Sequence, residues 1–233
     1  IDMRVAFPVS AEMLVQGDNS LTIESASKRG ADDIRVGEIQ LHPRKVDGLL
    51  GEATLKVIVH DGSGKPTTTP CRITIVDEGG SLVQTGAISN DHLAVRPGAI
   101  YTATGTAVVP LPAGRYTVYA GRGLECSLAT LPVDLKSGDE KSIHLSIRRE
   151  VSTEGYVACD THVHTRTHSG HGDSTVQERM ITLAGEGIEL PIATDHNVHI
   201  DHNPFAREMK VRRYFTPVIG NEVTTRTAHF NIF

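Results

Sequence analysis

The segment at residues 158–165 carries two histidines, His162 and His164, two positions apart in an expected strand. Successive side chains of a strand point to opposite faces, so both imidazoles lie on the same face. Two imidazoles at one end of a strand can bind a metal ion. Eight of the twelve histidines lie between Asp160 and the C-terminus. A solvated polar surface would not concentrate histidines in this way.

Alternating strands and helices are predicted around these histidines. Residues 157–162, 190–194 and 217–220 are the expected strands, and residues 205–214 form a polar helix. Thr175 and Glu178 have the spacing of a capping box that opens another helix. Its buried stripe is Val176, Met180, Leu183 and Ala184, and two glycines, Gly185 and Gly187, end it. A βαβαβ order predicts an α/β sheet with its functional site at the C-terminal ends of the strands.

Three successive strand ends supply candidate metal ligands in this region. The first supplies His162 and His164, the second His196 and the third Glu222, while His171 and His229 follow in expected loops. The set contains no cysteine, which favours a catalytic over a structural metal site. Histidines with a carboxylate suit Zn²⁺, Mn²⁺ or Fe²⁺. One carboxylate can bridge two ions and so build a multinuclear site.

Three ordered motifs carry a family resemblance. They are Asp-Thr-His-Val-His-Thr at 160–165, Ala-Thr-Asp-His-Asn at 193–197, and Gly-Asn-Glu at 220–222 with His229 seven residues later. Together they resemble the PHP (polymerase and histidinol phosphatase) superfamily of metal-dependent hydrolases. The carbaryl-hydrolase-like branch, in which a β-sandwich precedes the PHP barrel, is the most similar. The resemblance covers residues 155–233, and more loosely residues 50–150.

The resemblance implies a distorted (β/α)₇ barrel with two or three divalent metal ions. His162, His164 and Glu222 would bind the first ion, His171 and His196 the second, and Glu222 with His229 a third. His168 and Asp173 compete with His171 for its position. Glu222 and His196 are also candidate catalytic residues, together with Asp195, which could instead orient an imidazole. Because the chain stops at Phe233, before the family's late ligands, we expect residues 155–233 to be the N-terminal part of a barrel truncated at its C-terminus.

The preceding residues are predicted to be β structure, which makes the fold class multidomain β plus α/β. Residues 49–150 show short alternating strands at 53–60, 71–77, 107–120 and 142–149, typical of a β-sandwich. The turns at 61–66 and 111–116 resemble those of carboxypeptidase-regulatory-like, transthyretin-like domains. Within this domain His60, His92 and His144 are interpreted as surface or packing residues.

Residues 1–48 contain a turn at 17–19 and alternating segments at 21–23 and 35–41, which predict an antiparallel sheet with one wet face. This pattern resembles the end of a galactose-binding-like jelly roll. Such a start would allow a carbohydrate contact through the β domains.

Composition excludes several function classes. The net charge of −5 and the pI near 6.2 argue against binding duplex nucleic acid. No apolar run has the length of a membrane span. Cys71, Cys126 and Cys159 show no CxxC spacing, so we expect free buried thiols, with a Cys71–Cys126 disulfide as the alternative. Compartment and oligomeric state stay open, with export favoured over a cytoplasmic location.

Three functions follow from these observations. The first is a hydrolase that uses a metal-activated water on a small phosphoester. The second is a hydrolase of a carboxylic ester, carbamate or amide, as in the carbaryl-hydrolase-like branch. The third is a non-catalytic binding protein with a decayed barrel. The remaining loop histidines, His168, His199 and His202, are expected to bind no metal.

Overall fold

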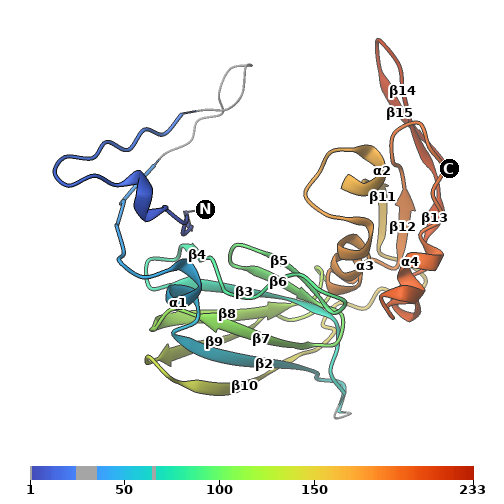
Figure 1. Cartoon of the computed structure of the whole chain (residues 1–233). Coiled ribbons are helices and arrows are strands. Elements are labelled where there is room, and N and C mark those ends of the chain that lie inside the picture. The colour runs from blue at the N-terminus through green and yellow to red at the C-terminus, as the bar shows by residue number, and fades with distance from the viewer. Residues whose placement is uncertain (1, 25–35, 65–66) are drawn as a thin grey trace.

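Alternation of apolar and polar residues builds a β-sandwich from residues 53–147 (Figure 1), as seen in a computed structural model that describes residues 2–24, 36–64 and 67–233. The smaller sheet has the order β10–β2–β7, with β10 parallel and β7 antiparallel to β2. In the larger sheet β3 is central, with β8 and then β9 along one edge and β6, β5 and β4 along the other. The strands are β2 (Ala53–Asp61), β3 (Cys71–Asp77), β4 (Leu82–Val83), β5 (Leu93–Arg96), β6 (Ala99–Thr102), β7 (Thr106–Leu111), β8 (Gly114–Gly121), β9 (Ala129–Leu135) and β10 (Glu140–Ile147).

The sandwich core consists of the inward-facing residues of both sheets. Burial alternates along β2 and β3, as expected when one face of each strand meets the opposite sheet. The turn at residues 112–113 connects the two sheets and closes no hairpin, because β7 pairs with β2 while β8 pairs with β3 and β9. The fully buried members of the core include Leu55, Val57, Val59, Ile73, Ile75, Val109, Leu111 and Val118.

The antiparallel sheet predicted for residues 1–45 does not form in the part of that segment that the structure describes. The described part of this segment contains one short strand, β1 (Met3–Arg4), which pairs in parallel with β4, and a 3₁₀ turn, η1 (Ala11–Met13). Alternating apolar residues such as Leu21, Ile39 and Leu41 stay exposed. Without a partner strand to bond and a core to cover, an alternating pattern does not produce a strand. Residues 25–35, and residues 65–66 of the predicted turn, lie outside the described residues.

Strands and helices alternate after the sandwich, as predicted. The strands β11, β12 and β13 form a parallel three-stranded sheet, and β14 continues past β13 into an antiparallel hairpin with β15. This hairpin was not predicted from the sequence. The elements are β11 (Cys159–Val163), α2 (Arg166–Ser169), α3 (Val176–Gly185), β12 (Leu190–Ala193), α4 (Asn203–Glu208), η2 (Arg212–Tyr214), β13 (Val218–Ile219), β14 (Asn221–Thr224) and β15 (His229–Ile232). A short helix, α1 (Val46–Leu50), precedes the sandwich.

Helix α3 agrees with the sequence prediction, whereas α4 differs from it in extent. The capping box of α3 is present, with Thr175 accepting from the Glu178 amide and Glu178 accepting from the Thr175 amide. The predicted stripe of α3 is buried. The helix predicted at 205–214 is wrong in extent, because α4 ends at Glu208 and Lys210 adopts a left-handed φ of 59°. That conformation interrupts a right-handed helix.

Helix α3 packs against both the parallel sheet and the sandwich. One apolar cluster joins Met180 and Ala184 of α3 with Ala94 and Ala103 of the sandwich. At Gly185 the helix comes so close that a Cβ atom would lie 2.9 Å from the Tyr101 ring and 3.1 Å from the Cys71 carbonyl. Glycine is therefore required for this contact. The two domains share part of their packing.

All three cysteines are free, so the alternative Cys71–Cys126 disulfide is absent. Cys71 is buried, which raises the pKa of its thiol to about 12. Cys159 is exposed, so the expectation that it is a buried packing residue is wrong. No helix among the described residues has both the length and the apolar character needed to cross a membrane.

We expect Ile73→Ala to lower the free energy of unfolding by about 2–4 kcal/mol, because it removes a fully buried side chain from the sandwich core. Urea unfolding followed by circular dichroism measures the change. Val108→Ala is the control, since Val108 is 52% exposed on the same sandwich and should change the value by less than about 0.5–1 kcal/mol. Equal losses in the two variants would contradict this description of the core.

Candidate metal centre

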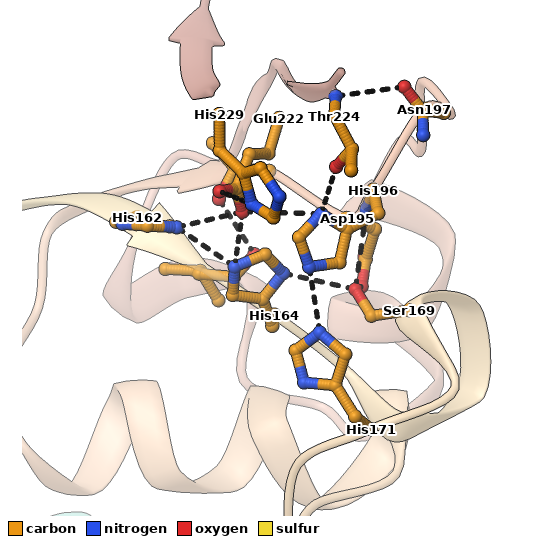
Figure 2. A network of polar contacts seen from close by, with 12 residues as sticks. His162, His164, Ser169, His171, Asp195, His196, Asn197, Glu222, Thr224 and His229 are labelled. Carbon is orange, nitrogen blue, oxygen red and sulfur yellow. Dashed lines mark hydrogen bonds and ion pairs between the residues drawn. The ribbon is translucent and has the colours of Figure 1, made fainter. Parts of the chain in front are cut away.

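Six side chains from separate segments meet at the C-terminal edge of the parallel sheet (Figure 2). His162 lies in β11 and His164 directly follows that strand, while His196 lies in the segment after β12. A parallel bridge between His196 and Glu222 extends the pairing past the ends of β12 and β13, which brings the second and third strand ends together. The structure thus assembles all the ligands predicted from the sequence, namely His162, His164, His171, His196, Glu222 and His229.

The carboxylate of Glu222 is the centre of this cluster. It is 5% exposed, and its Oε2 lies 3.0 Å from His162 Nε2 and 2.8 Å from His164 Nε2. Its Oε1 lies 3.0 Å from His229 Nδ1. Burial acts to raise the pKa of Glu222, but the hydrogen bond from His162 and the neighbouring His196 and His229 outweigh it, so the pKa is lowered. An ionised carboxylate therefore faces three imidazoles.

The imidazoles also approach one another through their nitrogens. His162 Nε2 lies 2.9 Å from His164 Nε2, and His171 Nε2 lies 2.7 Å from His196 Nε2. Burial lowers the pKa of His164, and the neighbouring His162 and His196 lower it further against the pull of Glu222. Neutral imidazoles are the form that binds metal ions. The electrostatics therefore keep His164 in its metal-binding form.

Three groups of three donors can be drawn within the cluster, and they share members. In each group the three donor atoms lie within 4.8 Å of one another. A histidine nitrogen binds zinc at about 2.1 Å, so donors at this spacing need only small side-chain movements to share one ion. The donor set fits a multinuclear site for divalent ions. The groups are His162–His164–Glu222, His164–His171–His196, and His196–Glu222–His229.

A hydrogen-bonded layer lies behind the ligands. Asp195 is 1% exposed, and its Oδ1 accepts from the Thr165 amide at 2.8 Å and from the Ser169 hydroxyl at 2.6 Å. Because the Ser169 proton goes to Asp195, the Ser169 oxygen is free to accept from His164 Nδ1, 3.0 Å away. This places the proton of His164 on Nδ1 and leaves the lone pair of Nε2 facing the other candidate ligands.

The same contacts assign a role to Asp195. Burial acts to raise its pKa, but the nearby His202 and the hydrogen bonds from Ser169 and Thr165 hold the pKa well below its usual range. Its oxygens are occupied by protein donors behind the ligands, so the structure favours the positioning role over the catalytic one. His202 is fully buried, with Nε2 3.8 Å from Asp195 Oδ2. His202 lies in the loop before α4 and outside the donor groups, as expected, although it is buried.

Geometry distinguishes His171 from His168 and Asp173, the two other candidates for its position. The ring of His168 packs against Phe205, with ring centroids 5.9 Å apart. The carboxylate of Asp173 is paired with Arg96 and Arg179, at 3.4 Å each. Neither residue belongs to a donor group of the cluster, whereas His171 does.

The hairpin β14–β15 positions the last ligands. His229 lies in β15, paired with Thr224, and not in the loop expected from the sequence. Thr224 Oγ1 lies 2.6 Å from His196 Nδ1, and the Thr224 amide donates to Asn197 Oδ1 at 3.0 Å. Thr224 and Ser169 were missed in the sequence, because hydroxyl residues are common in loops and no spacing marks these two. Thr165, directly after the second histidine of the first motif, could have been found from that position.

Another pair of histidines meets on the sandwich. His60 and His144 lie on the neighbouring strands β2 and β10, with stacked rings and a distance of 3.0 Å between His60 Nε2 and His144 Nδ1. Both side chains are on the surface, as expected.

No family model matches the chain, and no curated protein matches it. Among solved structures, it is similar to the Bacillus anthracis TIE protein, at 13% identity and a TM-score of 0.29 over 41% of this chain and 16% of that one. The minor pilin GBS52 of Streptococcus agalactiae is 16% identical, with a TM-score of 0.32 over 44% and 45%. A 5-hydroxyisourate hydrolase of Klebsiella pneumoniae is 18% identical, with a TM-score of 0.27 over 42% and 92%.

The chain spans less than half the length of the first two of these structures. At such identities and TM-scores, these similarities carry no argument about function.

We expect Asp195→Asn to destabilise the protein by about 1.5–3 kcal/mol at pH 7, because it replaces a buried, hydrogen-bonded carboxylate. The pKa of Asp195 is lowered in the fold from 3.8, so its ionised form stabilises the fold above that pH. This contribution is lost as pH falls below 3.8. The stability gap between the variant and the wild type should narrow between pH 6 and pH 3 in urea unfolding with EDTA present. A gap of constant size would contradict the assignment.

Proposed function

We propose that this chain is part of a metal-dependent hydrolase of the PHP superfamily, acting on a small phosphoester. The observation that carries the proposal is the convergence of five imidazoles and one buried carboxylate at the C-terminal edge of a parallel sheet. Catalytic sites of α/β folds lie at this edge. The three motifs that supply these residues are those of the family resemblance.

In the proposed centre, two or three ions of zinc, manganese or iron would be held by the three donor groups described above. Such ions would lower the pKa of a bound water to about 7 and would polarise the bond under attack. Glu222 belongs to two of the groups, which fits a bridging ligand. His164 and His196 also belong to two each, so the proposed site depends most on these three residues.

The residues of the chain itself would orient the ligands. Ser169 fixes the tautomer of His164, and Thr224 contacts Nδ1 of His196 at 2.6 Å, so Nε2 of each ring is the expected donor. Partners of this kind behind the ligands usually matter for metal affinity. Asp195 supports the arrangement through Ser169 and Thr165.

The fold is consistent with this proposal. Three parallel strands with α3 between β11 and β12 are what the first part of a (β/α)₇ barrel would contain. Under the proposal, residues 49–150 are the accessory carboxypeptidase-regulatory-like sandwich of the carbaryl-hydrolase-like branch. The jelly-roll end proposed for residues 1–48 finds little support, because the described residues there form one two-residue strand.

A second candidate is hydrolysis of a carboxylic ester, carbamate or amide. The contacts of Arg179 favour it. The guanidinium donates to the His164 carbonyl at 3.1 Å and pairs with Asp173. That arginine is therefore committed to the protein and does not face a substrate anion. A phosphate monoester would have its charge met by the metal ions.

We expect His196→Ala and Glu222→Ala to lose bound metal and hydrolysis together, because each residue belongs to two donor groups. Metal content after dialysis is measured by atomic emission, and activity with p-nitrophenyl phosphate and p-nitrophenyl acetate. His199→Ala is the matched control, since His199 is exposed and outside the donor groups. Wild-type metal content in both site variants would refute the proposed centre.

The two substrates distinguish the candidate reactions. Cleavage of the phosphate ester supports the phosphoesterase, and cleavage of the acetate alone rejects it in favour of the ester hydrolase. A protein that binds metal with the expected ligands but cleaves neither compound would support the non-catalytic binding function.

A further inference from the structure

The sandwich contacts the segment that carries one metal ligand. Arg96, the last residue of β5, donates from Nη2 to the Asp173 carbonyl and, at 3.2 Å, to the Ser174 hydroxyl. Its Nε lies 3.4 Å from Asp173 Oδ2, and its Nη1 lies 3.1 Å from Glu178 Oε1. The Arg96 side chain is 29% exposed, so these contacts are partly shielded from water. A single arginine thus holds both the loop before α3 and the first turn of α3.

The loop itself gives His171 little support. Its two neighbours, Gly170 and Gly172, have φ angles of 74° and 93°, a left-handed conformation that glycine adopts freely. The side chain of His171 is exposed, and its contacts are with other imidazoles of the cluster. The position of His171 therefore depends on where the flanking residues 173–174 are anchored.

Asp173 connects this anchor to a second ligand. Its Oδ1 lies 3.4 Å from Arg179 Nη2, and Arg179 Nε donates to the His164 carbonyl at 3.1 Å. His164 and His171 belong to the same donor group, together with His196. Two arginines, one from the sandwich and one from α3, therefore contact the Asp173 carboxylate two residues after His171, and Arg179 also holds the backbone of His164.

We propose that Arg96 is a positioning residue of the metal centre, through which the sandwich fixes His171 and completes the donor group His164–His171–His196. This inference rests on the function proposed above. It assigns the sandwich a part in metal binding, in addition to packing against α3.

The competing explanation is that Arg96 serves only to dock the two domains. The same interface offers a comparison, because Arg72 of β3 pairs with Glu186 at 2.8 Å. Glu186 lies at the far end of α3, beyond Gly185, and contacts no residue of the loop at 170–174 in the described contacts. Loss of that pair would weaken docking without releasing the loop.

The test is a titration of the metal-free full chain with Co²⁺, followed by visible absorption, for the wild type and the variants Arg96→Ala, Asp173→Asn and Arg72→Ala. His171→Ala shows which part of the titration belongs to the donor group of His171. We expect Arg96→Ala and Asp173→Asn to weaken the binding of the Co²⁺ ion in that group about 10-fold or more. Arg72→Ala should change the affinity for this ion less than about 2-fold. Arg96→Lys should restore part of the affinity, because lysine keeps the charge but not the planar fork.

A double variant separates positioning from a general loss of structure. In the background of His171→Ala, adding Arg96→Ala should cause no further loss of metal affinity. Asp173→Asn keeps the contact between Arg96 and Glu178, so it tests the loop if Arg96→Ala does not fold. Wild-type Co²⁺ affinity in both Arg96→Ala and Asp173→Asn would overturn the proposal. An equal loss of affinity in Arg72→Ala would overturn it as well. If His171→Ala itself retains every ion, the proposed metal centre fails and not the role of Arg96 alone.

Discussion

The buried carboxylate of Glu222 is the constraint on which the rest of the α/β part depends. An ionised group that is 5% exposed has a large desolvation cost unless several donors surround it. Here the surrounding imidazoles come from the end of β11, the segment after β12 and the strand β15. The parallel sheet brings the first two segments to one edge, and the hairpin β14–β15 returns the chain so that His229 reaches the other oxygen. The cluster therefore forms only when all of these elements are in place.

Much of this arrangement could be predicted from local sequence. The capping box of Thr175 and Glu178, the buried stripe of α3 and the strand at 190–193 depend on neighbours within a few residues, and the structure contains them. The ligands could be predicted because parallel strands place their C-terminal ends at one edge, so strand ends that are distant in sequence meet in space. His171 could be placed only after the family resemblance, and the structure brings it to His196.

Other features depend on partners that no local pattern identifies. The segments around Leu21 and Ile39 alternate like strands but find no sheet to join among the described residues. The left-handed conformation of Lys210 ends a helix whose periodicity would have allowed it to continue. Ser169 and Asp195 become informative only once the ring of His164 is in place. Arg96 lies 77 residues before Asp173, and nothing in the spacing of two oppositely charged residues predicts that they meet.

The close approach of α3 to the sandwich at Gly185 has a consequence for how the chain folds. Ala94 and Ala103 belong to the apolar cluster of the α/β part, although they lie in the sandwich. Removing either part exposes apolar surface of the other, so the two parts should lose their structure in one transition and not in two. A duplicated or transplanted copy of the α/β part would then need the sandwich surface as well. The two domains are therefore expected to be inherited together as one structural unit.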